Sequence, residues 1–252
     1  MVNQVLVALL LTSLAGLSTT FGSAIAFFIK KPTARILSLG LGLSAGVMIA
    51  VSFLEMLPSA IDSVGELKAY TAFFVGMLVI AGIDILVPHE YIGEKAGRDD
   101  FDPDLMRTGK LTAVGIAIHN FPEGLVTFVG TLASIKVGLL LAVAIALHNI
   151  PEGISVSLPI FSATGDRKKA FMISFLSGLA EPAGALLGGI ILFQYLSDTI
   201  MGLTLALIAG IMIFISFDEL LPVAHEHDKG HMASIGVISG MIIMAMTLLL
   251  LA

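Results

Sequence analysis

Long apolar runs that recur along the whole chain are the feature that most constrains its fold. Only 13% of the 252 residues are charged, whereas soluble domains carry about 25% charged residues. The sequence therefore predicts an all-α integral membrane protein with eight transmembrane helices, built as a single transporter domain over residues 1–252. The runs, each long enough to cross about 30 Å of hydrocarbon, lie near residues 5–29, 36–57, 70–88, 111–131, 137–158, 171–194, 201–222 and 233–251.

Basic residues gather in alternate breaks between these runs. Eleven of the 13 fall in one set of breaks, and only Lys68 and Lys136 fall in the other. Because basic loops stay in the cytoplasm, this pattern places both termini on the extracellular or periplasmic side. The longest break, at about residues 89–110, is expected to be a cytoplasmic loop. We expect a multi-pass protein of the cell (inner) membrane.

Two sequence motifs each occur twice in the chain, which indicates an internal repeat. Ser-Phe-Leu-Glu-Met-Leu-Pro-Ser-Ala at 52–60 matches Ser-Phe-Asp-Glu-Leu-Leu-Pro-Val-Ala at 216–224 at six of nine positions. These segments belong to the second and seventh runs, which cross the membrane in opposite directions. We therefore expect an inverted repeat of helices 1–3 and 6–8, with helices 4 and 5 between them, an architecture typical of secondary transporters.

The second repeated motif contains residue types that bind metal ions. His-Asn-Phe-Pro-Glu-Gly at 119–124 recurs as His-Asn-Ile-Pro-Glu-Gly at 148–153, and five of six positions agree. In each hexapeptide the His and the Glu are four residues apart, so a helix projects both from one face. The Pro between them leaves a carbonyl without its helical partner, which favours a local kink or unwinding. Glu181, in the sixth run, is expected at the same depth.

Three carboxylates in the middle of a membrane need a compensating cation. Unpaired, they would cost about 8–10 kcal/mol together, and the fourth, fifth and sixth runs carry no Lys or Arg at that depth. Imidazole combined with carboxylate suits zinc, iron(II) or manganese, whereas Ca²⁺ and Mg²⁺ prefer oxygen ligands alone. The ligands suit one ion or two ions bridged by Glu123 and Glu152. The predicted metal ligands are His119, Asn120, Glu123, His148, Asn149, Glu152 and Glu181.

Other polar residues are candidates for a metal pathway. The repeat places Glu55 near an outer mouth and the Asp218-Glu219 pair near an inner one, both toward helix ends. At the cytoplasmic side we expect an accepting or sensing role, or a solvated polar surface, for Asp84, His89, His225 and His227. The chain has no cysteine, which excludes thiolate ligands and disulfides.

At these motifs the sequence resembles the ZIP (Zrt/Irt-like) family of zinc and iron transporters, in particular its short bacterial members. The two hexapeptides and Gly-Leu-Ala-Glu-Pro at 178–182 carry the resemblance, which covers essentially the whole chain. It implies transport of divalent metal into the cytoplasm through a site shared by helices 4 and 5. The break at 89–110 lacks the histidine-rich stretch of many eukaryotic members, which argues against metal sensing there.

The residues allow two other functions. A metal-dependent intramembrane hydrolase is disfavoured because no His-Glu-x-x-His or Gly-x-Ser-x-Gly motif is present. An alkali-cation/proton exchanger is disfavoured because imidazoles are poor sodium ligands. We expect no catalytic residues and no cofactor, with zinc or another divalent transition metal, such as iron, manganese or cadmium, bound as substrate. The expected partners are metal ions and the lipid bilayer, with a homodimer compatible with this interpretation and no nucleic acid.

Overall fold

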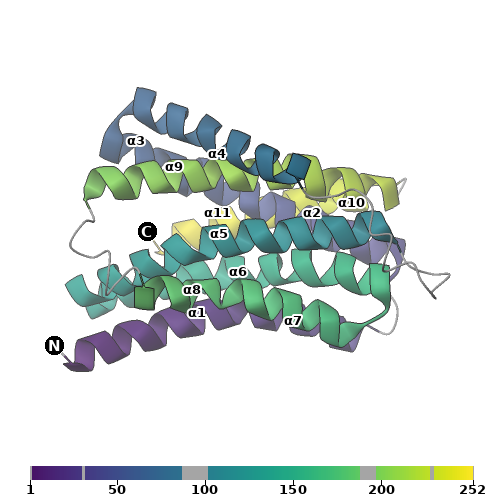
Figure 1. Ribbon diagram of the computed structural model, residues 1–252, viewed down its shortest axis with the longest axis horizontal. Coiled ribbons are helices and arrows are strands. Elements are labelled where there is room, and N and C mark those ends of the chain that lie inside the picture. Colours follow the sequence, from purple (N-terminus) through teal and green to yellow (C-terminus); the bar gives the residue numbers. More distant parts are fainter. Residues whose placement is uncertain (1, 30–31, 87–101, 188–196, 228–229, 252) are drawn as a thin grey trace.

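The protein is described by a computed structural model that covers residues 2–29, 32–86, 102–187, 197–227 and 230–251 (Figure 1). Within these residues the chain forms eight helical rods, and every regular element is helical. Some rods contain more than one segment. The elements are α1 (Val2–Phe28), α2 (Ala34–Val51), η1 (Ser52–Met56), α3 (Leu57–Val64), α4 (Glu66–Leu86), α5 (Pro103–Ala133), α6 (Ile135–Thr164), α7 (Arg167–Gly178), α8 (Ala180–Ala183), α9 (Asp198–Phe214), η4 (Ile215–Leu220), α10 (Leu221–His227) and α11 (Met232–Leu251).

The rods run alternately in opposite directions along one long axis. α1 begins and α11 ends at the same end of the bundle, which we call the terminal end (Figure 1). The opposite end, which we call the basic end, holds the start of α7 with its Arg167-Lys168-Lys169 run. Seven of the eight rods are long and apolar enough to cross a membrane. The eighth, α5, falls short because charged and polar residues, including Arg107, Lys110 and the first hexapeptide, interrupt its apolar surface.

Several rods extend beyond the expected spans. The rod that begins at α2 continues through Pro58 to Val64, and the rod that begins at α9 continues through Pro222 to His227. Glu55 and Glu219 therefore lie within continuous rods, and their expected placement toward helix ends is wrong. The expected loop at 89–110 is also too long, because α5 begins at Pro103. Asp102 caps this helix by accepting hydrogen bonds from the backbone N–H groups of Asp104 and Leu105.

A π-helical turn explains how each of these rods passes its proline. The backbone N–H of Leu57 donates to the Ser52 carbonyl, and the N–H of Leu221 donates to the Ser216 carbonyl, both five residues back. A proline ring normally clashes with the carbonyl four residues before it. The wider turn moves that carbonyl aside, so the helix continues. The two similar segments at 52–60 and 216–224 thus share a local structure as well as a sequence.

The rods pack as two bundles. The first, which we call the ligand bundle, contains α1, α5, α6, α7 and α8; the second, the framework bundle, contains α2, η1, α3, α4, α9, η4, α10 and α11. Figure 1 shows α3, α4 and α9 along one side of the molecule, α1, α7 and α8 along the other, and α5 and α6 between them. The bundles meet mainly where α2 packs on α6 and where α5 packs on α9 and η4.

Glycines allow the helices within each bundle to approach closely. A Cβ atom added at Gly76 of α4 would lie 1.9 Å from the Leu207 carbonyl oxygen of α9, and one added at Gly210 would lie 1.9 Å from the Phe73 carbonyl oxygen. Without hydrophobic expulsion from water to drive them together, membrane helices depend on such close packing. These contacts fix the rods that carry the buried polar residues.

We expect Gly76→Ala to destabilise the protein, because the added methyl group would have to separate α4 from α9. Overpacking of this kind costs about 1–3 kcal/mol. Gly82→Ala is the control in the same helix, since no described heavy atom would lie within 4 Å of its added Cβ. Thermal unfolding of the purified proteins in detergent should show a lower Tm for the Gly76 variant alone. Equal Tm values for the two variants would contradict the close approach.

Candidate metal centre

The histidine and glutamate side chains of the two hexapeptides meet between α5 and α6. Nε2 of His119 lies 3.2 Å from Oε1 of Glu123 and 3.3 Å from Oε1 of Glu152. Nε2 of His148 lies 3.1 Å from Oε1 of Glu123. Ligand atoms of His119, His148 and Glu152 all lie within 4.8 Å of one another. The antiparallel helices therefore bring the duplicated side chains into one cluster, which we call the central cluster.

These side chains are removed from solvent and leave hydrogen-bonding capacity unused. His119 is 1% exposed and Glu152 is 0% exposed. Within the described part of the chain, both ring nitrogens of His119, both carboxylate oxygens of Glu152 and Oε2 of Glu123 have no hydrogen-bond partner. Buried polar atoms are normally paired, so these carboxylate oxygens, together with one nitrogen of the His119 ring, fit a cation bound between them. The cation would be the substrate of a transporter rather than a resident cofactor.

The remaining predicted ligands form a layer beside the central cluster. Nδ2 of Asn149 donates to Oε2 of Glu181 at 2.8 Å and to the Ala15 carbonyl at 3.1 Å. Nδ2 of Asn120 lies 3.5 Å from the Ser177 carbonyl. The amide oxygens of both asparagines and Oε1 of Glu181 have no hydrogen-bond partner among the described residues. Three further oxygen ligands are therefore available next to the central cluster.

Local structure positions both hexapeptides. α5 and α6 continue through Pro122 and Pro151 as regular helices, so the expected local unwinding does not occur. The Ser44 hydroxyl of α2 donates to the Pro151 carbonyl at 2.5 Å, which ties the second hexapeptide to the framework bundle. A Cβ added at Gly124 would lie 1.8 Å from the Glu181 carbonyl oxygen, so this glycine lets α8 bring Glu181 against α5.

A cavity of about 180 Å³ adjoins the central cluster on its terminal side. Glu123 and His148 form its floor, and Val126, Leu141 and Ala144 on their terminal side line its walls. Glu55, on the π-helical turn of the framework bundle, also lines this cavity. Glu55 therefore lies closer to the central cluster than the predicted position near an outer mouth.

At the basic end an arginine connects the two bundles. Arg107 of α5 forms an ion pair with Asp84 of α4, and its Nη1 donates to Oε1 of Glu219 at 3.1 Å. Asp218 approaches the same two carboxylates, and the three could hold a metal ion by their spacing. The role of Arg107 was not predicted from the sequence, because this residue was expected in a loop rather than in α5. The Asp-Pro pair at 102–103 was the signal that a helix begins there.

The histidines proposed for the cytoplasmic side do not join this group. Nδ1 of His225 donates to the Leu221 carbonyl at 2.8 Å, and Nδ1 of His227 donates to the Val223 carbonyl at 2.9 Å. Both hydrogen bonds are within the rod that ends in α10, and each leaves the Nε2 atom of its ring available. His89 lies outside the described residues.

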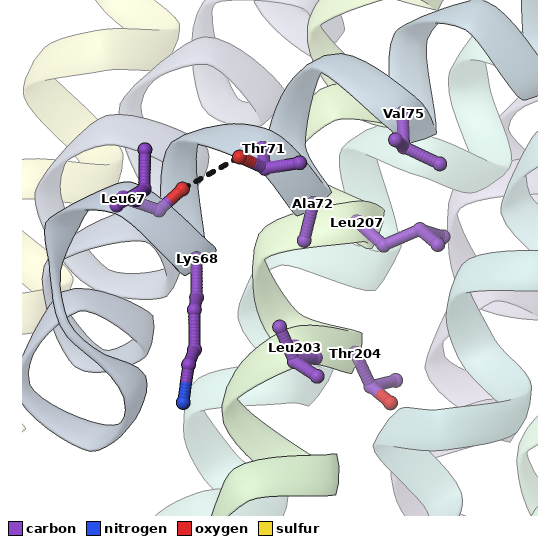
Figure 2. Close-up of a pocket in the computed structure, with 8 residues that line it drawn as sticks. All are labelled: Leu67, Lys68, Thr71, Ala72, Val75, Leu203, Thr204 and Leu207. Atoms are coloured by element: carbon purple, nitrogen blue, oxygen red, sulfur yellow. Dashed lines mark hydrogen bonds between the residues drawn. The ribbon is translucent and has the colours of Figure 1, made fainter.

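A larger groove of about 560 Å³ lies between α4 and α9, away from this cluster. Figure 2 shows its lining, where the Thr71 hydroxyl donates to the Leu67 carbonyl and the Lys68 amine stands at one side. The other lining residues shown are Ala72, Val75, Leu203, Thr204 and Leu207. With no carboxylate or imidazole in its lining, the groove has no ligands for a divalent metal ion.

Helical rods of membrane-spanning length around a buried histidine–glutamate cluster define this protein as a membrane transporter of metal ions. Comparison with known proteins agrees, because the family described as "ZIP Zinc transporter" matches residues 94–248. The chain belongs to this family, as the sequence motifs predicted. It is a multi-pass transporter rather than an enzyme, so the alternative of an intramembrane hydrolase is excluded.

Bacterial relatives match the chain over almost its whole length. A protein named "Zinc transporter ZupT" from Clostridium perfringens is 50% identical, and the match covers 98% of this chain and 97% of the relative. The protein of the same name from Oceanobacillus iheyensis is 53% identical over 99% of this chain and 100% of the relative. Another from Campylobacter jejuni is 48% identical over 99% and 98%.

We expect Glu152→Gln to weaken zinc binding, because it removes a charge from a buried position at whose level α5, α6 and α8 carry no Lys or Arg. Loss of a group that merely supports a ligand costs roughly 10–100-fold in metal affinity, so loss of a ligand should cost at least as much. Equilibrium binding of radioactive zinc to the purified protein in detergent measures this effect. Glu226→Gln, on the exposed surface of α10, is the matched control. Equal losses in both variants would rule out a specific role for Glu152.

Proposed function

We propose that the protein carries zinc ions across the cell membrane into the cytoplasm through the central cluster. The observation that supports this most directly is the set of carboxylate and imidazole atoms without a hydrogen-bond partner, beside a cavity on the terminal side of the central cluster. The names of the relatives, each about half identical to this chain, give zinc as the transported metal. The same donor atoms suit iron(II), manganese and cadmium, so these ions are expected as weaker substrates.

The proposed ligands belong to two adjacent positions. His119, His148 and Glu152 would hold one ion, with Glu123 between the two rings. Asn120, Asn149 and Glu181 would complete a second position, with Glu123 and Glu152 as bridging carboxylates. Their placement in adjoining layers, with unpaired oxygen atoms in both, supports a centre that holds two ions.

Glycine contacts support the inverted repeat. The Gly76–Leu207 contact of α4 and α9 recurs between α11 and α2, where a Cβ added at Gly240 would lie 2.1 Å from the Leu43 carbonyl oxygen. The Gly210–Phe73 contact recurs in the same way as Gly46 against Val237. All the paired positions are 164 residues apart, as are Glu55 and Glu219. One register therefore relates the packing of two helix pairs and the two π-helical turns, which supports a structural repeat of rods 1–3 and 6–8.

The same argument relates α5 to α6. A Cβ added at Gly124 would lie 1.8 Å from the Glu181 carbonyl oxygen, and one added at Gly153 would lie 1.9 Å from the Thr19 carbonyl oxygen. Gly184 against Phe121 and Gly22 against Ile150 form a second equivalent pair of contacts. The positions in α5 and α6 are 29 residues apart, as in the hexapeptides. The central pair of helices is thus consistent with a twofold relation whose axis passes close to the metal ligands.

The charge pattern orients the protein in the membrane. The basic end would face the cytoplasm and the terminal end the outside, with all eight rods crossing the bilayer, including α5. Its polar surface is compatible with a span because α6, α7, α8 and α9 surround it. In this proposal residues 1–252 form a single transporter domain. A homodimer remains a prediction of the sequence, for which the exposed apolar side chains of α4 and α11 offer a surface.

The proposed route follows the carboxylates. A metal ion would enter the cavity past Glu55, exchange water for the central ligands, and leave along Asp84, Asp218 and Glu219 toward the cytoplasm. His225 and His227, at the end of the same rod as Glu219, would receive it there. An inside-negative potential favours this direction by about 4.6 kcal/mol per 100 mV for a divalent ion without a moving counter-charge.

We expect purified protein in sealed proteoliposomes to accumulate radioactive zinc, and Glu123→Gln to abolish uptake. The carboxylate of Glu123 faces both histidines, so its loss removes charge from the middle of the site. Glu226→Gln serves again as the control, at matched insertion into the vesicles. Native protein that moves no divalent metal would overturn the proposed function, and normal uptake by the Glu123 variant would overturn the assignment of the site.

A further inference from the structure

The ion pairs of Arg107 link the ligand bundle to the framework bundle. Arg107 belongs to α5, whereas its partners Asp84 and Glu219 belong to α4 and η4. All three are largely removed from solvent, with side-chain exposures of 13%, 16% and 4%. The basic end of the bundle is thus held together by a cation between two carboxylates. The terminal end instead has the cavity that reaches the metal ligands.

The repeat gives each member of the Arg107–Glu219 pair a counterpart at the terminal end. Counting 29 residues from Arg107, as between the hexapeptides, reaches Lys136 in the first turn of α6. Counting back 164 residues from Glu219 reaches Glu55. Each counterpart carries a charge of the same sign as the residue that it matches. Lys136 and Lys68 are the only two basic residues in the breaks between apolar runs at the terminal end of the bundle.

The two equivalent pairs differ in this structure. Glu219 is bound to Arg107, but Glu55 lines the cavity together with Glu123 and His148. Lys136 is exposed, and no ion pair joins it to Glu55 in the described part of the chain. Positions related by an inverted repeat should exchange their environments when a transporter changes the side on which it is open.

We propose that Arg107–Glu219 and Lys136–Glu55 are alternative latches, formed in turn as the substrate site faces outward and inward. In the state described, the Arg107 latch closes the basic end. When the bundles shift to open that end, Arg107 leaves its carboxylates, and Lys136 meets Glu55 across the cavity and closes it. The carboxylates released by Arg107 then become available to the departing metal ion. Arg107 and Lys136 are therefore positioning residues, which never contact the central ligands.

The two latches are unequal, which sets the resting state. A guanidinium has a planar fork that binds two carboxylates at once, whereas an ammonium is a point charge. Asp84 gives Arg107 a second carboxylate, and its position in the repeat corresponds to Leu248, which offers none. The Arg107 latch is consequently the stronger, and the protein without metal rests open toward the terminal end.

The test measures conformation by the reactivity of one cysteine. Because the natural chain has none, Ala144→Cys places a single thiol in the wall of the cavity, one helical turn from His148. Its rate of labelling by a maleimide in purified, metal-free protein reports how often the cavity is open. Arg107→Ala should slow labelling by roughly fivefold or more, a typical size for coupling between two states. Lys136→Ala should leave labelling fast, and the double variant Arg107→Ala/Lys136→Ala should return toward the native rate.

Controls separate a latch from general damage. Lys68→Ala, which removes the other basic residue of the terminal-end breaks, should leave the labelling rate unchanged. The charge exchange Arg107→Glu/Glu219→Arg should restore fast labelling if the pair itself matters, and it replaces the single variant should Arg107→Ala not fold. Native labelling in Arg107→Ala, or equal slowing in Arg107→Ala and Lys136→Ala, would overturn the proposal. The inference rests on the proposed transport function, but labelling needs no zinc, so failed uptake and failed latching are distinguishable.

Discussion

The structure depends on the need to neutralise carboxylates in the middle of an apolar helical bundle. Glu123, Glu152 and Glu181 are buried where hydrocarbon, not water, surrounds the helices, and no Lys or Arg of α5, α6 or α8 lies at their level. An unpaired charge at that depth costs several kcal/mol, so the site is stable only with a cation or protons. Close glycine contacts and the duplicated hexapeptides serve this requirement because they hold many ligands in a small volume.

The proposed metal ligands and the carboxylates of the proposed pathway lie in different bundles. The seven proposed metal ligands belong to the ligand bundle, whereas Glu55, Asp84, Asp218 and Glu219 belong to the framework bundle. In the proposed mechanism, ions held by one bundle pass to carboxylates of the other as the two shift. The π-helical turns contribute to this arrangement because they let a rod pass its proline while directing a glutamate toward the contact between bundles.

Features that a physical rule fixes over a short distance were predicted correctly from the sequence. The four-residue spacing of His119 and Glu123 places both on one face of a helix, and the same spacing recurs at His148 and Glu152. Features that depend on a less common backbone geometry were not predicted. Pro58 reads as the end of a helix unless the preceding turn widens, and the placement of Glu55 was wrong for that reason. Arg107 was missed because a charged first turn resembles a loop.

By itself the sequence determined the class of fold, the direction of each rod and the residue types of the buried histidine–glutamate cluster. Hydrophobic length, basic loops and the His-Asn-x-Pro-Glu-Gly pair are local or additive properties, and they need no knowledge of packing. Only the tertiary structure decided where the cavity beside the central cluster lies and which carboxylates already have a partner. The Arg107 pairs join residues from three rods, 23 and 112 positions apart in the chain. Such contacts arise from how the bundles pack, and no local pattern encodes them.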